Sequence, residues 1–191
     1  MEKDREVIFD KNTIEFVTVA AEYCAFMERA REKRRDEWVD TALKLLPLLY
    51  LKASLIPPCE RLGIDEPAQS VSEADYEYVR MAVKAVMGSQ DDYLEVFVPD
   101  MIYSEGPLTC TISEDLADIY QDVRNFIEVF QCGINLIMND ALAVCKEHFS
   151  TYWGQRLVNA MRALHDAKYN QCEEGESRDA QADYPENETG L

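Results

Sequence analysis

Residues 38–58 read WVDTALKLLPLLYLKASLIPP, the most apolar stretch of the chain. Its leucines fall on every side of a helical wheel. A helix that is apolar all round is typical of a segment enclosed by other helices, so we expect Leu46, Leu49 and Leu55 to be buried. Pro47 removes one backbone donor, and we expect it to kink this helix or to start a second one.

The same stretch does not have the pattern of a membrane span. Asp40, Lys44 and Lys52 interrupt it, and no uncharged run approaches the roughly 20 residues that a bilayer requires. Pro57 and Pro58 end it, because a residue before proline avoids the helical region. We therefore predict a buried helix of a globular domain and no membrane partner.

The chain has 191 residues, a length that fits one domain with tails. Its formal net charge is −18, from 37 acidic and 19 basic residues. Such a charge repels phosphate groups, so we predict no nucleic-acid partner. Basic partners and metal ions remain compatible with this charge.

The cysteines and the N-terminus indicate the compartment. The six cysteines form no CxxC pair and have no zinc-ligand spacing. Cys24, Cys132 and Cys145 stand among apolar residues, and we predict that they are small core side chains. The N-terminus lacks the apolar region of a signal peptide, so we predict a reduced, cytoplasmic protein.

Apolar residues recur at helical spacing along most of the chain, which predicts an all-α fold. We expect a compact bundle of about five helices with an extended aromatic connector and a disordered acidic tail. A capping-box pattern, Ser72 with Asp75, marks the start of the third helix, and either Thr111 with Glu114 or Ser113 alone caps the fourth.

The same patterns divide the chain into three parts. Residues 1–11 are expected to be a flexible N-terminus, 12–170 a single helical domain and 171–191 an acidic disordered tail. The tail lacks a core-forming pattern, which is the basis for its predicted disorder. The fifth helix is expected to start near Asn139 and to run to the end of the domain.

The connector lies between the third and fourth helices. Residues 93–98 are short, aromatic and β-branched, so we predict an extended segment. Because one isolated strand cannot form a sheet, we expect it to lie unpaired over the helices. Its Tyr93, Phe97 and Tyr103 either line a pocket or plug the end of the bundle, and we favour the plug.

A row of acids on the fourth helix is the best candidate for a functional site. Asp115, Asp118 and Asp122 are three and four residues apart and therefore share one face of the helix. Hard cations need convergent carboxylates. One interpretation of the row, together with His148 of the fifth helix, is therefore a metal or proton-transfer site.

The other interpretation is structural, and we favour it. His148, Arg156 and Arg162 on the fifth helix are possible partners for the acids, because a short turn near Gly133 favours antiparallel packing of the two helices. On this interpretation there is no metal and no cofactor. The catalytic residues, if any, stay unknown.

Motifs of named reactions are missing from the sequence. Two histidines are too few for a three-histidine site, and neither follows a glutamate by three residues as di-iron bundles require. Metalloprotease, phosphate-loop, dinucleotide and nucleophile-elbow patterns do not occur.

Four stretches carry a resemblance to a known family. They are EDLADIYQDVRNF at 114–126, EHFSTYWGQRLVNAMRALH at 147–165, LLPLLYLKASLIP at 45–57 and DDYLEVFVP at 91–99. With them, most of residues 12–168 resembles an uncharacterised bacterial family of small all-helical proteins, a domain of unknown function. The resemblance implies a bacterial all-helical domain, and it implies no activity and no catalytic residue.

Two classes of function remain. The favoured one is a non-catalytic protein-interaction or regulatory domain that presents an acidic surface to a protein partner of unknown identity. The alternative is a metal-assisted hydrolase that uses the carboxylates of the fourth helix. The exposure of Asp118 and Asp122 separates them, because a solvated row supports docking, whereas a concave cluster without a basic partner supports metal.

Overall fold

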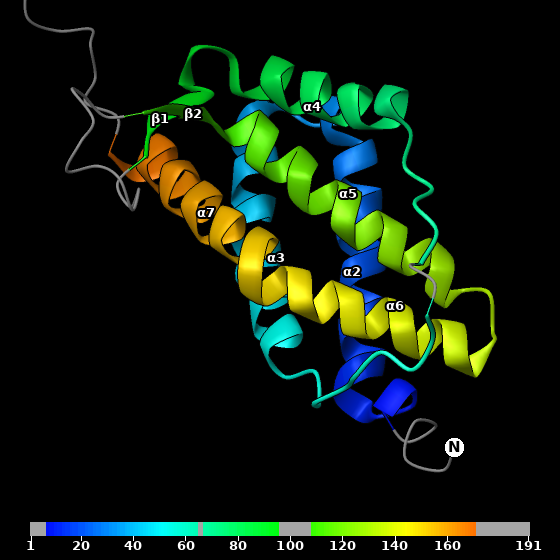
Figure 1. The fold of residues 1–191 in the computed structure, drawn as a ribbon. Coiled ribbons are helices and arrows are strands. Elements are labelled where there is room, and N and C mark those ends of the chain that lie inside the picture. The colour runs from blue at the N-terminus through cyan, green and yellow to red at the C-terminus, as the bar shows by residue number, and fades with distance from the viewer. Residues whose placement is uncertain (1–6, 65–66, 96–107, 171–191) are drawn as a thin grey trace, which may run out of the picture.

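A computed structural model describes residues 7–64, 67–95 and 108–170 (Figure 1). Its α-helices are α2 (Lys11–Glu28), α3 (Arg35–Ser54), α4 (Glu73–Met87), α5 (Ile112–Phe130), α6 (Asn135–His148) and α7 (Gly154–Tyr169). Shorter elements are the 3₁₀ turns η1 (Ala30–Glu32) and η2 (Gly88–Gln90), the π turn η4 (Phe149–Trp153), and the strands β1 (Asp92–Leu94) and β2 (Thr109–Thr111). The prediction of an all-α fold is confirmed.

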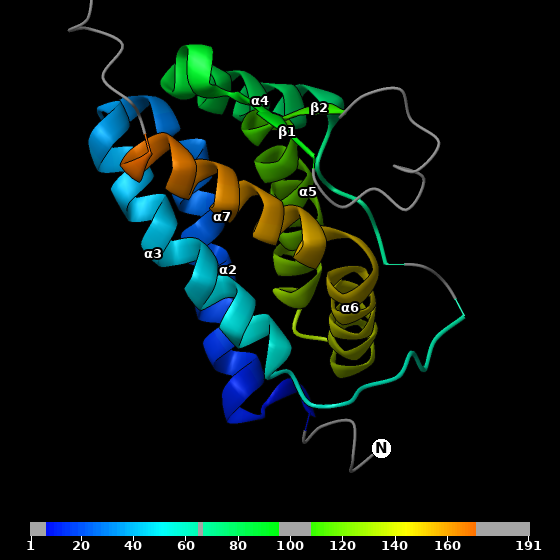
Figure 2. The ribbon, with the colours of Figure 1, turned by 90° about the vertical axis from the view of Figure 1, so that its left-hand side faces the viewer.

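Helix α5 lies at the centre of the bundle and packs against α2, α4, α6 and α7. Helices α2 and α3 run side by side on the far side in Figure 1 and form the left-hand side of the bundle in Figure 2. Helix α4 crosses the end of the bundle at the top of both views. The largest fully buried side chains include Trp38, Trp153, Tyr23 and Phe16, and Ile8, from before α2, is buried with them.

Helix α3 buries one face and leaves the opposite face open. Leu46 and Leu49 are 1% and 0% exposed, as expected, but Leu55 is 44% exposed. The predictions that Leu55 is buried and that the helix is enclosed on all sides are therefore wrong. The helices that pack most against α3 are α2 and α7, and both lie on its core side. Pro47 lies within the helix and starts no second one.

Local capping signals fixed the helix starts as expected in two places. The Ser72–Asp75 capping box is present at α4, and the Thr111 hydroxyl accepts a hydrogen bond from the Glu114 N–H at α5. Helix α5 ends three residues before Gly133, whose φ of +74° is a conformation that favours glycine.

The expected fifth helix is α6 and α7 joined by the π turn η4. The two lie nearly in line in Figure 1, and Figure 2 shows that the chain bends where they meet. The wide turn brings the Phe149 carbonyl close to Gly154. A Cβ at position 154 would lie 2.3 Å from that oxygen, so the turn requires glycine there. Helix α6 starts at Asn135, four residues earlier than the sequence indicates.

The connector differs from its prediction because the first strand has a partner. Strand β1 pairs antiparallel with β2, and Tyr93 lies opposite Cys110. The partner strand was missed because it is only three residues long and directly precedes α5. Phe97 and Tyr103, and the tail at 171–191, lie outside the described residues.

The cysteine predictions hold for two of three positions. Cys24 and Cys145 are buried in the core, but Cys132 is exposed after the end of α5. The burial of Cys132 was predicted from its apolar neighbours in sequence. One of them, Ile134, is also exposed, so apolar neighbours did not indicate burial here.

We expect Leu49→Ala to lower the free energy of unfolding by about 2–5 kcal/mol, because it deletes buried methyl groups and leaves a cavity. Leu55→Ala on the same helix is the matched control, and it is expected to cost less than about 0.5 kcal/mol because its side chain is already half in solvent. Urea denaturation of both variants measures the difference. Equal costs would contradict the one-sided burial of α3.

Candidate functional site

The first acid of the row, Asp115, is buried at the start of α5 and has two partners. Arg156 of α7 donates from Nη1 to its Oδ1 at 2.8 Å. The Tyr93 hydroxyl of β1 donates to its Oδ2. The carboxylate therefore ties the hairpin, α5 and α7 together at one point.

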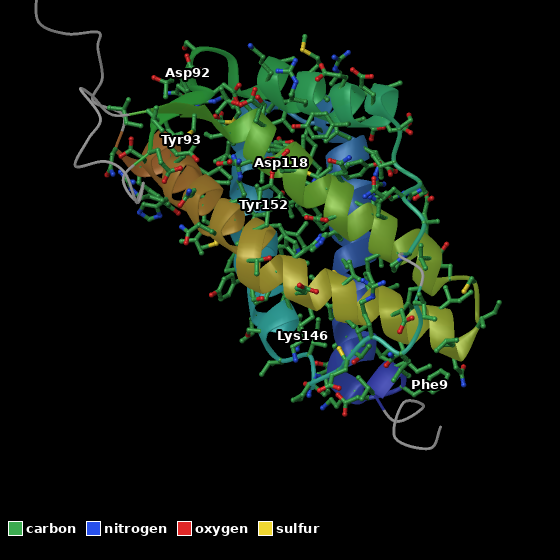
Figure 3. All side chains as sticks on the ribbon, in the orientation of Figure 1. Phe9, Asp92, Tyr93, Asp118, Lys146 and Tyr152 are labelled. Atoms are coloured by element: carbon green, nitrogen blue, oxygen red, sulfur yellow. The ribbon has the colours of Figure 1, made fainter. Side chains whose placement is uncertain are left out.

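The second acid, Asp118, lies one turn further along α5 and accepts hydrogen bonds from two tyrosines. The Tyr76 hydroxyl of α4 is 2.9 Å from Oδ1, and the Tyr152 hydroxyl is 2.7 Å from Oδ2. Arg156 Nε is 3.5 Å from Oδ2, and its guanidinium also lies over the Tyr152 ring, 5.2 Å from its centroid. In Figure 3, Tyr93, Asp118 and Tyr152 lie along the boundary between α5 and α7.

The third acid, Asp122, pairs with His148, the last residue of α6. His148 Nδ1 is 2.7 Å from Asp122 Oδ1, and the histidine side chain is 44% exposed while that of the aspartate is 19% exposed. The pair lines a pocket of about 210 Å³ between α5, α6 and the loop that follows α3.

Burial and hydrogen bonds act in opposite directions on these acids. Burial raises the pKa of Asp115 above its ordinary value, and the bonds from Tyr93 and Arg156 lower it in part. Burial likewise raises the pKa of Asp122, and its bond with His148 opposes this. Burial and the bond to Asp118 raise the pKa of Tyr152 to about 12, so this phenol remains a donor at neutral pH.

The three acids form neither a solvated row, which would support docking, nor a concave cluster without a basic partner, which would support a metal site. The acids are not solvated, because their oxygens accept bonds from phenols, a guanidinium and an imidazole. They also do not form a cluster without a basic partner, since Arg156 lies between Asp115 and Asp118. Within residues 7–64, 67–95 and 108–170, no group of three or more His, Cys, Asp or Glu side chains is arranged to hold a metal ion.

The remaining candidates that the structure describes are Arg162 of α7 and Tyr93 of β1. Arg162 is exposed and lines a hollow of about 1090 Å³ together with Tyr93, away from the three acids. Tyr93 therefore contributes to a hollow as well as to the bond with Asp115. The other two members of the predicted aromatic pocket are not described.

A second polar constellation was missed by the sequence analysis. We call residues 57–64 and 67–71 the strap, and buried polar side chains of α6 hold its first part. Asp140 accepts hydrogen bonds from the N–H groups of Leu62 and Gly63, both at 2.8 Å. Asn139 donates to the Glu60 carbonyl at 2.8 Å.

Further bonds secure both ends of the strap. Lys146 of α6 donates to the carbonyls of Ile56 and Pro57. Asn125 of α5 accepts from the N–H groups of Ser70 and Val71 at 2.8 and 2.9 Å. The signal in the sequence was the polar pair Asn139–Asp140 between apolar residues near the predicted start of the fifth helix.

Comparison with known proteins gives the family. The family described as domain of unknown function (DUF5063) matches residues 7–170. The chain belongs to this family. It is also similar to protein BF1032 from Bacteroides fragilis, whose crystal structure has a TM-score of 0.78 and 53% sequence identity, and the match covers 87% of this chain and 98% of that one. No curated protein is similar to this chain.

The family and the relative agree with the resemblance drawn from the sequence, including a bacterial relative. Neither description names an activity, a ligand or a partner. None of the helices in the described part of the chain is long and apolar enough to cross a membrane.

Tyr93→Phe is expected to lower the free energy of unfolding by about 1–3 kcal/mol, because it leaves one oxygen of a buried carboxylate without its donor. Tyr78→Phe is the matched control, since that exposed hydroxyl reaches the Glu28 carbonyl only at 3.4 Å. Thermal and urea melts compare the two. A Tyr93→Phe protein as stable as the wild type would show that Asp115 does not depend on this phenol.

Proposed function

We propose that this protein is a non-catalytic, cytoplasmic protein-interaction domain that docks a helix of its partner on the outer face of α3. The observation that carries the proposal is the two-sided hydrophobicity of this helix. Its sequence has the pattern of a helix covered all round, whereas the folded chain covers only the core side. An occupant of the open side would account for the pattern.

The open side has the geometry that helix recognition uses. Leu48, Leu51 and Leu55 follow the spacing i, i+3, i+7 and are 40%, 50% and 44% exposed. Apolar anchors at this spacing are typical of a helix laid along a groove. Contiguous exposed apolar side chains on one helix also favour an interaction site over scattered surface leucines.

Hollows lie at both ends of this leucine stripe. One of about 370 Å³ lies between α2 and α3 and includes Leu45 and Leu48 in its lining. Another of about 570 Å³ lies beyond the end of α3, between Ala53 and Phe149. Side chains of a docked helix that flank its central anchor would enter these hollows, which favours a partner helix of at least two turns.

Charge favours a basic amphipathic helix as the occupant. The lysines beside the stripe are already paired, Lys44 with Asp40 at 2.6 Å and Lys52 with Glu15 at 2.6 Å. The hollow beside Leu48 is lined by side chains of both signs, Glu22 and Glu32 with Arg29, Lys33 and Lys44. The attraction for a cationic helix therefore comes from the net charge of −18 of the whole chain. Such a field accelerates the approach of a cationic partner.

This proposal moves the interaction surface away from the row of acids. Asp115, Asp118 and Asp122 were the expected acidic face, but a carboxylate that accepts internal hydrogen bonds has little left to offer a partner. The same argument weakens the metal-assisted hydrolase, because a cation would have to displace Tyr76, Tyr152 or His148 from the oxygens it needs.

A photo-crosslinking residue tests the docking face. With p-benzoylphenylalanine in place of Leu51, we expect one or a few defined crosslinked products in cells of the source bacterium. The matched control is the same residue in place of Met81, which is similarly exposed on α4. Products should form at position 51 and be absent at position 81.

A second substitution checks that the product depends on the apolar face. Leu51→Lys should abolish binding of the captured partner while leaving the melting temperature within a few degrees, because this side chain is half in solvent. Identical products from positions 51 and 81, or a partner that binds Leu51→Lys as well as wild type, would contradict the proposal. A product that is a second copy of this chain would replace the partner helix with self-association.

A melt with divalent ions tests the alternative. We expect Mg²⁺, Mn²⁺ and Zn²⁺ to leave the melting temperature unchanged, since the carboxylate oxygens are occupied by internal donors. A saturable rise in wild type that Asp118→Ala and Asp122→Ala abolish would indicate a metal site by mass action. That result would put the hydrolase in first place.

A further inference from the structure

The pocket beside Asp122 and His148 has an apolar floor and a polar rim. Phe126 of α5 and Ala141, Val144 and Cys145 of α6 form the floor. Strap residues 67–69 form the facing wall. The polar part of the lining is Arg61, Gln69, Asp122, Asn125, Glu147 and His148, so the pocket is mixed in character. A concave site with an apolar floor and convergent polar groups can hold a small molecule.

The hydrogen bond to Asp122 fixes which nitrogen of His148 is available. An ionised carboxylate can only accept, so the proton of the neutral ring resides on Nδ1, which donates to Asp122 at 2.7 Å. Nε2 then keeps its lone pair. His148 lines the pocket, and its Nε2 is a hydrogen-bond acceptor because Asp122 sets the tautomer of the ring.

Hydrogen bonds fix the strap, which forms one wall of the pocket. Asn125 lines the pocket and accepts through Oδ1 from the N–H groups of Ser70 and Val71. The group that its amide can still offer is therefore the Nδ2 donor. The lining of the pocket thus includes an acceptor on His148 and a donor on Asn125, beside the polar side chains of Arg61, Gln69 and Glu147.

Size and polarity together define the ligand. Water occupies about 30 Å³ per molecule, so a volume of about 210 Å³ has room for at least one six-membered ring with a substituent. An apolar body fits the floor. A hydroxyl can donate to His148 and accept from Asn125 at once, which neither an ether nor a hydrocarbon can do.

We propose that this pocket binds a small alcohol or phenol, with its apolar body on Phe126 and Val144 and its hydroxyl donating to His148 Nε2. Asp122 acts as the positioning residue that holds the accepting tautomer. The site is separate from the leucine stripe of α3, and it stands or falls independently of the docking proposal.

Phenol is the probe and benzene, which has the same ring without the hydroxyl, is its control. At about pH 8, above the ordinary histidine value of ~6.5, we expect phenol to shift the ring resonances of His148 saturably and to raise the melting temperature. Its affinity should exceed that of benzene about five- to tenfold, the range that one hydrogen bond supplies. His165 of α7, outside the pocket lining, should not shift.

Asp122→Asn tests the role of the carboxylate. The new amide can donate to Nδ1, which moves the ring proton to Nε2 and removes the acceptor. We expect a long-range ¹H–¹⁵N spectrum to show the changed tautomer. Phenol affinity should fall, because the phenol hydroxyl must then accept from Nε2–H, and a phenol is a weaker acceptor than donor. His165→Asn is the matched control and should bind phenol as the wild type does.

His148→Leu gives the same test should Asp122→Asn fail to fold, because the histidine is nearly half exposed. Its phenol and benzene affinities should be equal. Equal binding of phenol and benzene by wild type overturns the proposal without any variant. Wild-type phenol affinity in Asp122→Asn or His148→Leu overturns it as well.

Discussion

A carboxylate enclosed at the start of α5 constrains the packing of one half of the bundle. Removing one partner of a buried ion pair typically costs about 3–5 kcal/mol, because the other charge is left uncompensated. Asp115 therefore requires Arg156 of α7 and Tyr93 of β1 to meet it. The hairpin is anchored by this requirement, and α7 is fixed in its position along α5.

In the other half of the bundle a buried carboxylate is again satisfied by donors from a distant part of the chain, and here the donors are backbone N–H groups. Asp140 accepts from two successive N–H groups of the strap, and a Cβ at Gly63 would lie 2.5 Å from Asp140 Oδ2, so a larger residue there would push the carboxylate away from these donors. Asn125 holds the strap further along. A segment without helix or strand thus becomes a fixed wall, and the pocket beside His148 exists because of it.

The hydrogen-bond networks around Asp115 and around the strap show which polar groups are already used in the fold and which surfaces are left for function. The acids that share a face of α5 are bonded inward, and their role in the fold follows from the geometry of their partners. What the chain leaves open are an apolar stripe on α3 and a small pocket with a tautomer-fixed histidine. We infer that recognition of a partner and of a small ligand use these two places.

The sequence by itself determined the elements and the identity of the best polar row. Helix starts are local, so Ser72 with Asp75 and Thr111 with Glu114 could be read from spacing alone. The all-α class follows from apolar periodicity, and errors of a few residues in the predicted helix ends do not change it. Asp115, Asp118 and Asp122 were found because three- and four-residue spacing places side chains on one helical face.

Tertiary structure decided which groups meet. Arg156, His148 and Arg162 were all expected to be partners of the row of acids. The rotation of α7 about its axis places Arg162 in the lining of a separate hollow instead, and the sequence alone does not determine that rotation. Tyr76 and Tyr152 were missed because a phenol has the same apolar pattern as a core residue until its hydroxyl finds a carboxylate. The open face of α3 was hidden for a related reason, since periodicity reports how apolar a side chain is and only the neighbouring helices decide whether anything covers it.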